Sequence, residues 1–204
     1  VGAGAPGTLQ FHRFEESQYN TFSNELAAGH QKAGERLLGV STVQVHPVIR
    51  RVADTFNLQL QSRSGELTLR LDAANDLMQA DESHLSNLVS NLIDNAIRYT
   101  PSGRSVTVRL DLDSQQALAI LEVEDEGPGI PEEHREKVFQ RFYRILGSNT
   151  QGSGLGLAIV REIVQQHGGS ISIRDHHPGA TPPGCIFRIV FPINPFNELQ
   201  YDER

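Results

Sequence analysis

Tryptophan is absent from this 204-residue sequence, and cysteine and methionine occur once each. A single cysteine, Cys185, excludes a disulfide within the chain and fits a reducing compartment. Cys185 lies in a strand-like run, so we interpret it as a small core residue. Long apolar runs are also missing: no stretch approaches the roughly 18 residues that a membrane-spanning helix needs, and no signal peptide is evident. We therefore expect no direct insertion of this chain into a membrane.

The sequence also lacks an excess of positive charge. It carries 18 Lys and Arg against 25 Asp and Glu, which gives a net charge of −7. Nucleic-acid-binding domains usually present a basic face, so this balance argues against a nucleic-acid partner. Any phosphate-bearing ligand must then be held by local groups and not by a general positive field.

Composition divides the chain into three parts. Residues 1–7 are rich in glycine and alanine and look like a linker, and residues 8–40 contain helix formers without apolar periodicity. We therefore expect a partly ordered lead-in over residues 1–40. We expect one folded domain over residues 41–192 and a polar, acidic tail over residues 193–204.

Hydrophobic periodicity predicts both helices and strands in the middle part. Helical spacing marks residues 45–60, 81–99 and 154–166, and a short helix is expected from Pro131 to about Phe139. Strand-like alternation marks residues 67–71, 105–113, 117–124, 170–174 and 185–191. Residues 141–151 lack a clean period and look like a mobile loop. Because hairpins cannot form the units of a wholly parallel sheet, we predict a two-layer α/β sandwich with a mixed, mainly antiparallel sheet.

Two glycine-rich turns, residues 125–129 and 152–157, organise the chain. The second turn opens directly into a predicted helix, and a glycine-rich first turn presents bare N–H groups and a positive dipole end that suit phosphate. The first turn holds one carboxylate, Asp125, which would repel phosphate but could accept a hydrogen bond from an exocyclic amine such as that of adenine. The two turns are therefore predicted to bind opposite ends of one nucleotide.

The helix predicted over residues 81–99 carries a polar track. At about 100° per residue, Asn91, Asn95 and Arg98 lie within roughly 60° of one another at the edge of the apolar stripe. Two amides and a guanidinium could line a nucleotide site. The alternative is an ordinary solvated face on a helix that otherwise packs.

Four motifs together resemble a known family. Residues 91–101 (Asn-Leu-Ile-Asp-Asn-Ala-Ile-Arg-Tyr-Thr-Pro) resemble the N box of the catalytic, ATP-binding domain of bacterial two-component sensor histidine kinases. Residues 125–130 and 152–157 resemble its two glycine boxes, and residues 139–144 resemble its F box. The motifs occur in the family's order and cover about residues 41–192. The resemblance implies the Bergerat-type ATP-binding fold, with ATP beneath a lid formed by residues 138–153.

The same resemblance implies roles for individual residues. Asp125 would bind the adenine amine, and Asn95 would coordinate Mg²⁺ that bridges the phosphates. Catalysis would involve Asn91, Arg98, which stands where the family often has lysine, and the lid arginines Arg141 and Arg144, for which simple solvation is the alternative. The implied ATP-binding set is Asn91, Asn95, Arg98, Tyr99, Asp125, Gly127, Gly129, Ile130, Phe142, Gly152, Ser153, Gly154, Leu155, Gly156 and Leu157.

Asn91 separates kinase from ATPase chemistry. Relatives of the same fold that hydrolyse ATP carry a glutamate at this position as the general base, whereas an amide cannot accept a proton near neutral pH. We therefore predict phosphoryl transfer to a protein nucleophile, with slow hydrolysis. A non-catalytic nucleotide-binding module and an anti-sigma-type serine kinase of the same fold remain alternatives. A dinucleotide-binding domain is disfavoured, because the second glycine turn follows a polar loop and lacks the G-x-G-x-x-G spacing.

The acceptor is not evident in this sequence. None of the eight histidines stands in the sequence context of a histidine-kinase phosphoacceptor. We therefore expect the acceptor in a dimerisation and histidine-phosphotransfer domain of the same full-length protein, outside this chain, with a response regulator as the next partner. The resemblance further implies a cytoplasmic domain of an inner-membrane sensor kinase.

Overall fold

The computed structural model describes residues 40–73, 76–113, 117–145 and 153–192. Residues 1–39 of the predicted lead-in, the predicted tail, and residues 146–151 of the predicted mobile loop lie outside these residues. The described elements are β1 (Ser41–Gln44), α2 (Val45–Gln61), β2 (Glu66–Leu71), β3 (Leu77–Ala80), α3 (Glu82–Tyr99), β4 (Ser105–Asp113), β5 (Leu118–Asp125), α4 (Glu132–Arg135), the 3₁₀ turn η1 (Lys137–Phe139), α5 (Gly156–Gln166), β6 (Ser170–Arg174) and β7 (Cys185–Pro192).

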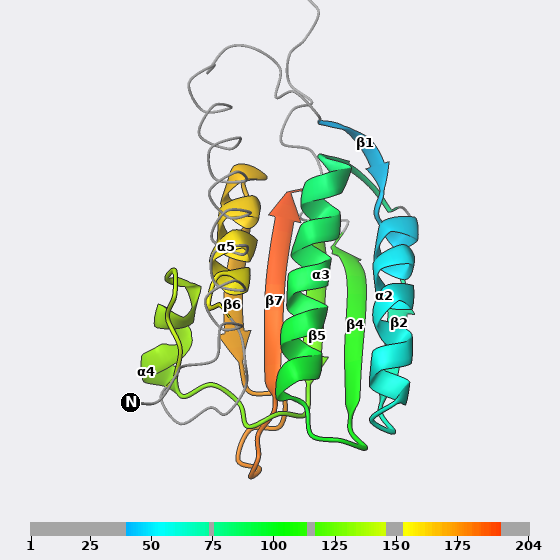
Figure 1. Cartoon of the computed structure of the whole chain (residues 1–204). Coiled ribbons are helices and arrows are strands. Elements are labelled where there is room, and N and C mark those ends of the chain that lie inside the picture. Colours follow the sequence, from blue (N-terminus) through cyan, green and yellow to red (C-terminus); the bar gives the residue numbers. More distant parts are fainter. Residues whose placement is uncertain (1–39, 74–75, 114–116, 146–152, 193–204) are drawn as a thin grey trace, which may run out of the picture.

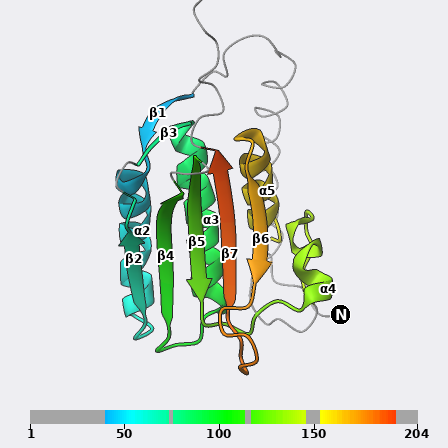
Figure 2. The same ribbon diagram turned by 180° about the vertical axis from the view of Figure 1, so that it is seen from behind.

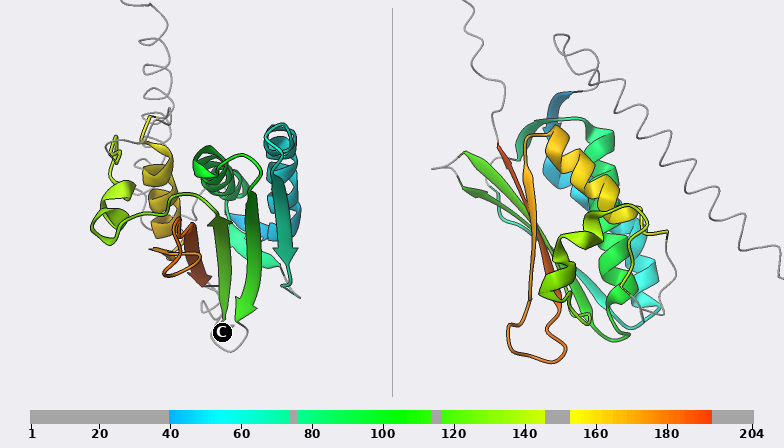
Figure 3. Two further views of the ribbon diagram at one scale, coloured as in Figure 1. Left: turned by 90° about the horizontal axis from the view of Figure 1, so that it is seen from below. Right: turned by 90° about the vertical axis from the view of Figure 1, so that its left-hand side faces the viewer.

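The main sheet has five strands in the order β2-β4-β5-β7-β6. Its neighbours pair antiparallel except β2 and β4, which run parallel because the chain crosses over through β3 and α3 between them. Helices α2, α3 and α5 cover one face of this sheet, and no described helix covers the other (Figures 1 and 2). Seen along the sheet edge, the helices form the second layer (Figure 3). The predicted two-layer sandwich with a mixed, mainly antiparallel sheet is confirmed.

The central helix α3 follows its sequence pattern closely. Asp81 caps its start, because the Asp81 carboxylate accepts hydrogen bonds from the Ser83 and His84 backbone N–H groups at 2.8 and 3.3 Å. Its apolar stripe is buried against the sheet and the neighbouring helices, and comprises Leu85, Leu88, Val89, Leu92, Ile93, Ala96 and Ile97. The edge of this stripe is thereby fixed beside the sheet, which positions the polar track of the same helix.

The C-terminal end of α3 is held by Arg63, which follows α2. The two terminal nitrogens of Arg63 donate to the carbonyls of Ile97 and Thr100 at 2.6 and 2.9 Å. A cation at this end of a helix satisfies carbonyls that have no partner within the helix and complements its dipole. Arg63 therefore joins the ends of two helices on the same sheet face.

Two strands were not predicted from the sequence. β1 and β3 form a separate antiparallel pair in which Ser41 lies opposite Ala80. Each strand is four residues long, which is too short for alternation to distinguish a strand from a loop. β1 continues into α2 without an intervening loop, so the small sheet lies where the described chain enters the domain (Figure 1). Among the described residues, no helix has both the length and the apolar character to cross a bilayer.

Candidate nucleotide-binding site

A cavity of about 500 Å³ opens between α3, the turn after β5, the start of α5 and the chain after η1. Of the residues singled out from the sequence, those that line it are Asn91, Asn95, Arg98, Tyr99, Asp125, Gly129, Ile130, Arg144, Ser153, Gly154, Gly156 and Leu157. Its volume is in the usual range for a site that encloses a small ligand. Segments that are far apart in the sequence therefore meet around one cavity.

Four of the singled-out residues are described outside the cavity lining, and Gly152 is outside the described residues. Leu155 is buried in the core, whereas Arg141 is exposed and Phe142 is 53% exposed. Gly127 contributes through its backbone, since its N–H donates to the Asp125 carboxylate at 2.8 Å. A side chain at Gly127 would lie 2.8 Å from the same carboxylate oxygen and 2.9 Å from the Tyr99 carbonyl, so the turn requires glycine there.

Asp125 ends β5, lines the cavity and is only 3% exposed. Burial raises the pKa of this carboxyl from 3.8 to about 6, and the Gly127 N–H, the nearby His176 and the Cys185 backbone partly offset the effect. At neutral pH the group is still mostly ionised. A buried carboxylate at a cavity wall is a strong acceptor for a ligand N–H group.

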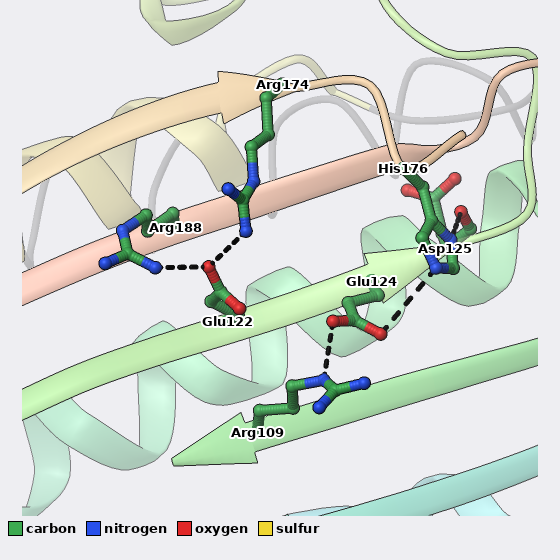
Figure 4. Close-up of polar contacts among 7 residues, drawn as sticks. All are labelled: Arg109, Glu122, Glu124, Asp125, Arg174, His176 and Arg188. Atoms are coloured by element: carbon green, nitrogen blue, oxygen red, sulfur yellow. Dashed lines mark hydrogen bonds and ion pairs between the residues drawn. The ribbon is translucent and has the colours of Figure 1, made fainter. Parts of the chain in front are cut away.

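The outer face of the same strand carries a charge network (Figure 4). The Glu122 carboxylate accepts hydrogen bonds from Arg174 and Arg188 at 2.8 and 2.6 Å, and Glu124 accepts one from Arg109 at 2.6 Å. His176 donates from Nδ1 to the Asp125 backbone carbonyl at 3.1 Å. These contacts tie β5 to β4, β6, β7 and the segment after β6, so the strand end that presents Asp125 is fixed from several sides.

The polar track of α3 forms another part of the cavity wall. The Asn91 side-chain amide donates to the Asn87 carbonyl at 2.8 Å, which orients the Asn91 oxygen away from its own helix turn. A Cβ atom at Gly156 would lie 2.8 Å from that oxygen, so glycine allows the start of α5 to approach the Asn91 amide. Arg98 donates to Asp94 at 2.6 Å, one turn earlier on α3. Asn91, Asn95 and Arg98 all line the cavity.

The described ends of the predicted lid are joined to each other. The Phe142 N–H donates to the Gly154 carbonyl at 2.9 Å, and Phe142 has a left-handed backbone with φ of 64°. Gly154 has φ of 74°, and a Cβ atom there would lie 2.9 Å from the Phe142 backbone. Tyr143 lines the cavity and its hydroxyl is 2.6 Å from His134 Nδ1 on α4. The described segments on either side of residues 146–152 are thus joined to each other, and the first of them contacts α4.

Several cavity residues were missed by sequence reasoning. They are Asp94, Pro128, Pro131, Val138, Tyr143, Ile145, Cys185 and Phe187. Most lie inside or beside the four motifs, so their nearness to a motif could have marked them as cavity residues. Cys185 and Phe187 come from β7, and only the pairing that sets Asp125 opposite Cys185 brings them to the site. Cys185 is 3% exposed, and burial raises the pKa of its thiol, in line with the expected core residue.

The carboxylates, histidines and cysteine of the described residues form no group of three or more that could hold a metal ion. Asn95 lines the cavity and offers an amide oxygen, a hard ligand of the type that Mg²⁺ accepts together with water and substrate phosphates. This donor set fits a cation that arrives with a nucleotide better than a cation held by protein alone.

Comparison with known proteins identifies the family. Residues 80–195 match the model of the histidine kinase-, DNA gyrase B- and HSP90-like ATPase family. The chain is 39% identical over 145 residues to the signal transduction histidine-protein kinase/phosphatase MprB of Mycobacterium sp. strain KMS, a match that covers 71% of this chain and 28% of that protein. A second MprB, from Mycobacterium ulcerans, is 38% identical over 167 residues, which cover 80% of this chain and 32% of the relative.

Solved structures agree with this assignment. A structure of the mycobacterial sensor histidine kinase MprB matches with a TM-score of 0.68 at 35% identity, over 75% of this chain and 97% of that one. A nucleotide-free catalytic domain of the histidine kinase ThkA matches with a TM-score of 0.66 at 26% identity, over 76% of this chain and 95% of that one. The chain spans about three tenths of the length of the curated relatives that it matches. It belongs to the histidine kinase-, DNA gyrase B- and HSP90-like ATPase family, as the ATP-binding catalytic domain of a sensor histidine kinase.

Proposed function

We propose that the cavity binds ATP with its adenine against Asp125 and its phosphates between α3 and the start of α5. The observation that carries this proposal is the buried Asp125 carboxylate in a cavity that is also lined by the amides of α3, by Arg98 and by the start of α5. Asp125 accepts the adenine amine, while the described part of the second glycine turn, residues 153–156, would present N–H groups to phosphate. Tyr99, Ile130 and Leu157 also line the cavity.

The Asn95 amide oxygen would hold Mg²⁺ together with the ATP phosphates. The ion would supply positive charge that stabilises the transferring γ-phosphoryl group. Arg98 and Arg144 line the same cavity and would contribute guanidinium groups to the phosphates. Arg141 is exposed beside them, and its role would depend on the lid.

The domain transfers the γ-phosphoryl group to a histidine of a dimerisation and histidine-phosphotransfer domain, from which it passes to a response regulator. The eight histidines of this chain lack the phosphoacceptor context, which supports an acceptor elsewhere in a longer protein. Because Asn91 cannot act as a general base, water is a poor competitor and hydrolysis is slow. This chemistry requires ATP, so the domain faces the cytoplasm in the full-length kinase.

Labelling with γ-labelled MgATP tests the proposal. The chain alone is expected to acquire no acid-labile phosphate and to release phosphate slowly. The phosphotransfer domain of its own full-length protein, supplied separately, is expected to become labelled. The Asp125→Asn variant should bind ATP at least about tenfold more weakly by calorimetry, because it loses a charge-assisted hydrogen bond.

Three results would contradict the assignment. Acid-labile phosphate on the isolated chain would place the acceptor within it. Rapid phosphate release that persists in Asn91→Ala would indicate an ATPase. MgATP binding without any transfer to the phosphotransfer domain would favour a non-catalytic nucleotide-binding module.

A further inference from the structure

The loop between β6 and β7, residues 175–184, packs against the turn that follows Asp125. All residues of this loop are described, and none of them lines the cavity. The Gly184 N–H donates to the Gly127 carbonyl at 3.1 Å. A Cβ atom at Gly184 would clash with the Asp125 carbonyl oxygen, so glycine allows the two backbones to touch. The position of the turn therefore depends on a loop that lies outside the cavity wall.

His176 extends its side chain from this loop to the end of β5 (Figure 4). Its Nδ1 donates to the Asp125 backbone carbonyl at 3.1 Å, and its Nε2 lies 3.8 Å from the Glu124 carboxylate. The His176 side chain is only 23% exposed. One imidazole ring thus contacts the last two residues of the strand that presents Asp125 to the cavity.

The same ring acts on the Asp125 carboxyl through its charge. Burial raises the pKa of Asp125 to about 6, and the positive charge of a protonated His176 is one of the influences that oppose this rise. The charged and titratable groups on the elements around His176 are Glu124 and Asp125 on β5, Arg109 on β4, Cys185 on β7, Arg135 on α4, and Asp175 and His177 in its own loop.

We propose that His176 is a positioning residue of the nucleotide site, which holds the end of β5 from outside the cavity and couples ATP affinity to pH through Asp125. This inference rests on the proposed function, since it assumes that the ionised Asp125 accepts a ligand N–H group. ATP affinity should then fall as pH drops through the pKa of Asp125, about 6. Without the His176 charge this pKa rises, so the fall should begin at a higher pH.

A purely structural role makes a different prediction. If His176 only stabilised the fold, its replacement would lower the free energy of unfolding. Any effect on ATP affinity would then be the same at every pH. The pH at which affinity has fallen by half would stay where it is in the original chain. The position of this midpoint is therefore the informative quantity.

The test is calorimetric titration of MgATP between about pH 5 and about pH 8. His176→Leu removes both the donor and the charge, and should bind about fivefold more weakly at pH 8, the factor for one lost hydrogen bond. His176→Asn places an amide N–H where Nδ1 lies but removes the charge. Its affinity at pH 8 should stay within about twofold of the original, because the hydrogen bond to the Asp125 carbonyl is kept. Both variants should shift the midpoint to higher pH.

His177 supplies the matched controls. It is exposed and its ring stacks on His176 at 4.0 Å between centroids, in the same loop. His177→Leu and His177→Asn should leave both the affinity at pH 8 and the midpoint unchanged. Comparison with the original chain removes the effect of protonation of ATP itself. Urea unfolding shows whether each variant is folded, and His176→Asn against His177→Asn tests the inference even if His176→Leu does not fold.

Three results would overturn the inference. They are an original affinity at pH 8 in a folded His176→Leu, a midpoint that does not move in His176→Asn, and equal effects of the His176 and His177 changes. If the original chain binds MgATP and Asp125→Asn weakens binding while the His176 variants behave like the original, only this inference fails. If the original chain binds no MgATP, the proposed function fails.

Discussion

At the scale of single residues, the buried Asp125 carboxylate suits the recognition of a ligand N–H group but reduces the stability of the folded domain near neutral pH. Its carboxyl pKa is raised from 3.8 to about 6, so the folded state favours the protonated form. The contribution of this group to stability is therefore greatest below its unfolded-state pKa and is lost as pH rises through about 6. Near neutral pH the domain therefore contains an ionised, buried carboxylate that lowers the stability of the fold.

Asp125→Asn should therefore stabilise the free domain at neutral pH. The amide oxygen can still accept the Gly127 N–H, and the buried charge is removed. The free energy of unfolding of the variant minus that of the original chain should be about 2 kcal/mol larger at about pH 8 than at about pH 4. Urea unfolding at both pH values measures this difference. The exposed Asp54→Asn serves as the control, and a variant that is equally destabilised at both pH values would contradict the expected cost of burying Asp125.

At the scale of elements, the sequence predicted most helices and strands because each carries its own period. The α3 stripe and the β4–β5 pair are local patterns, and both are confirmed. The members of the polar track, Asn91, Asn95 and Arg98, all line the cavity because one helix carries them. β1 and β3 were not predicted because each depends on pairing with a strand that is distant in sequence.

The cavity shows the same limit of prediction from local sequence patterns. Cys185 and Phe187 reach it only through the pairing of β7 with β5, and no local pattern indicates that register. The ends of the helices are also held from a distance. Asp76, which precedes β3, accepts the N–H groups of Val45 and His46 at the start of α2, with its backbone and side-chain oxygens. Such contacts are tertiary, so sequence periodicity does not contain them.

Arg63→Ala tests one of these distant contacts. It leaves the Ile97 and Thr100 carbonyls without their guanidinium partner, in a part-buried position. We expect a loss of about 1–2 kcal/mol in the free energy of unfolding, measured by urea denaturation. Arg50→Ala, an exposed arginine on α2, is the matched control and should change stability by less than about 0.5 kcal/mol. Equal effects of the two variants would show that Arg63 does not stabilise the end of α3.

At the scale of the whole molecule, the sheet has two chemically different faces. One is covered by α2, α3 and α5, and the other carries charged residues on adjacent strands (Figures 3 and 4). Glu122 belongs to the second face, yet its side chain is only 8% exposed, whereas Arg174 and Arg188 are 55% and 34% exposed. The arginines can be rehydrated if the contact is lost, but the carboxylate cannot.

This asymmetry predicts which changes the sheet tolerates. Glu122→Gln should cost about 1 kcal/mol, because the amide oxygen still accepts from the arginines. Replacing both Arg174 and Arg188 with Met should cost about 3 kcal/mol, since it leaves a buried carboxylate without its cations. Adding Glu122→Gln to that double variant should then restore much of the lost stability, because it removes the unpaired charge. Urea unfolding of the four proteins measures this cycle. A triple variant less stable than the double would mean that the arginines act through the packing of their stems, and that charge balance does not hold this face together.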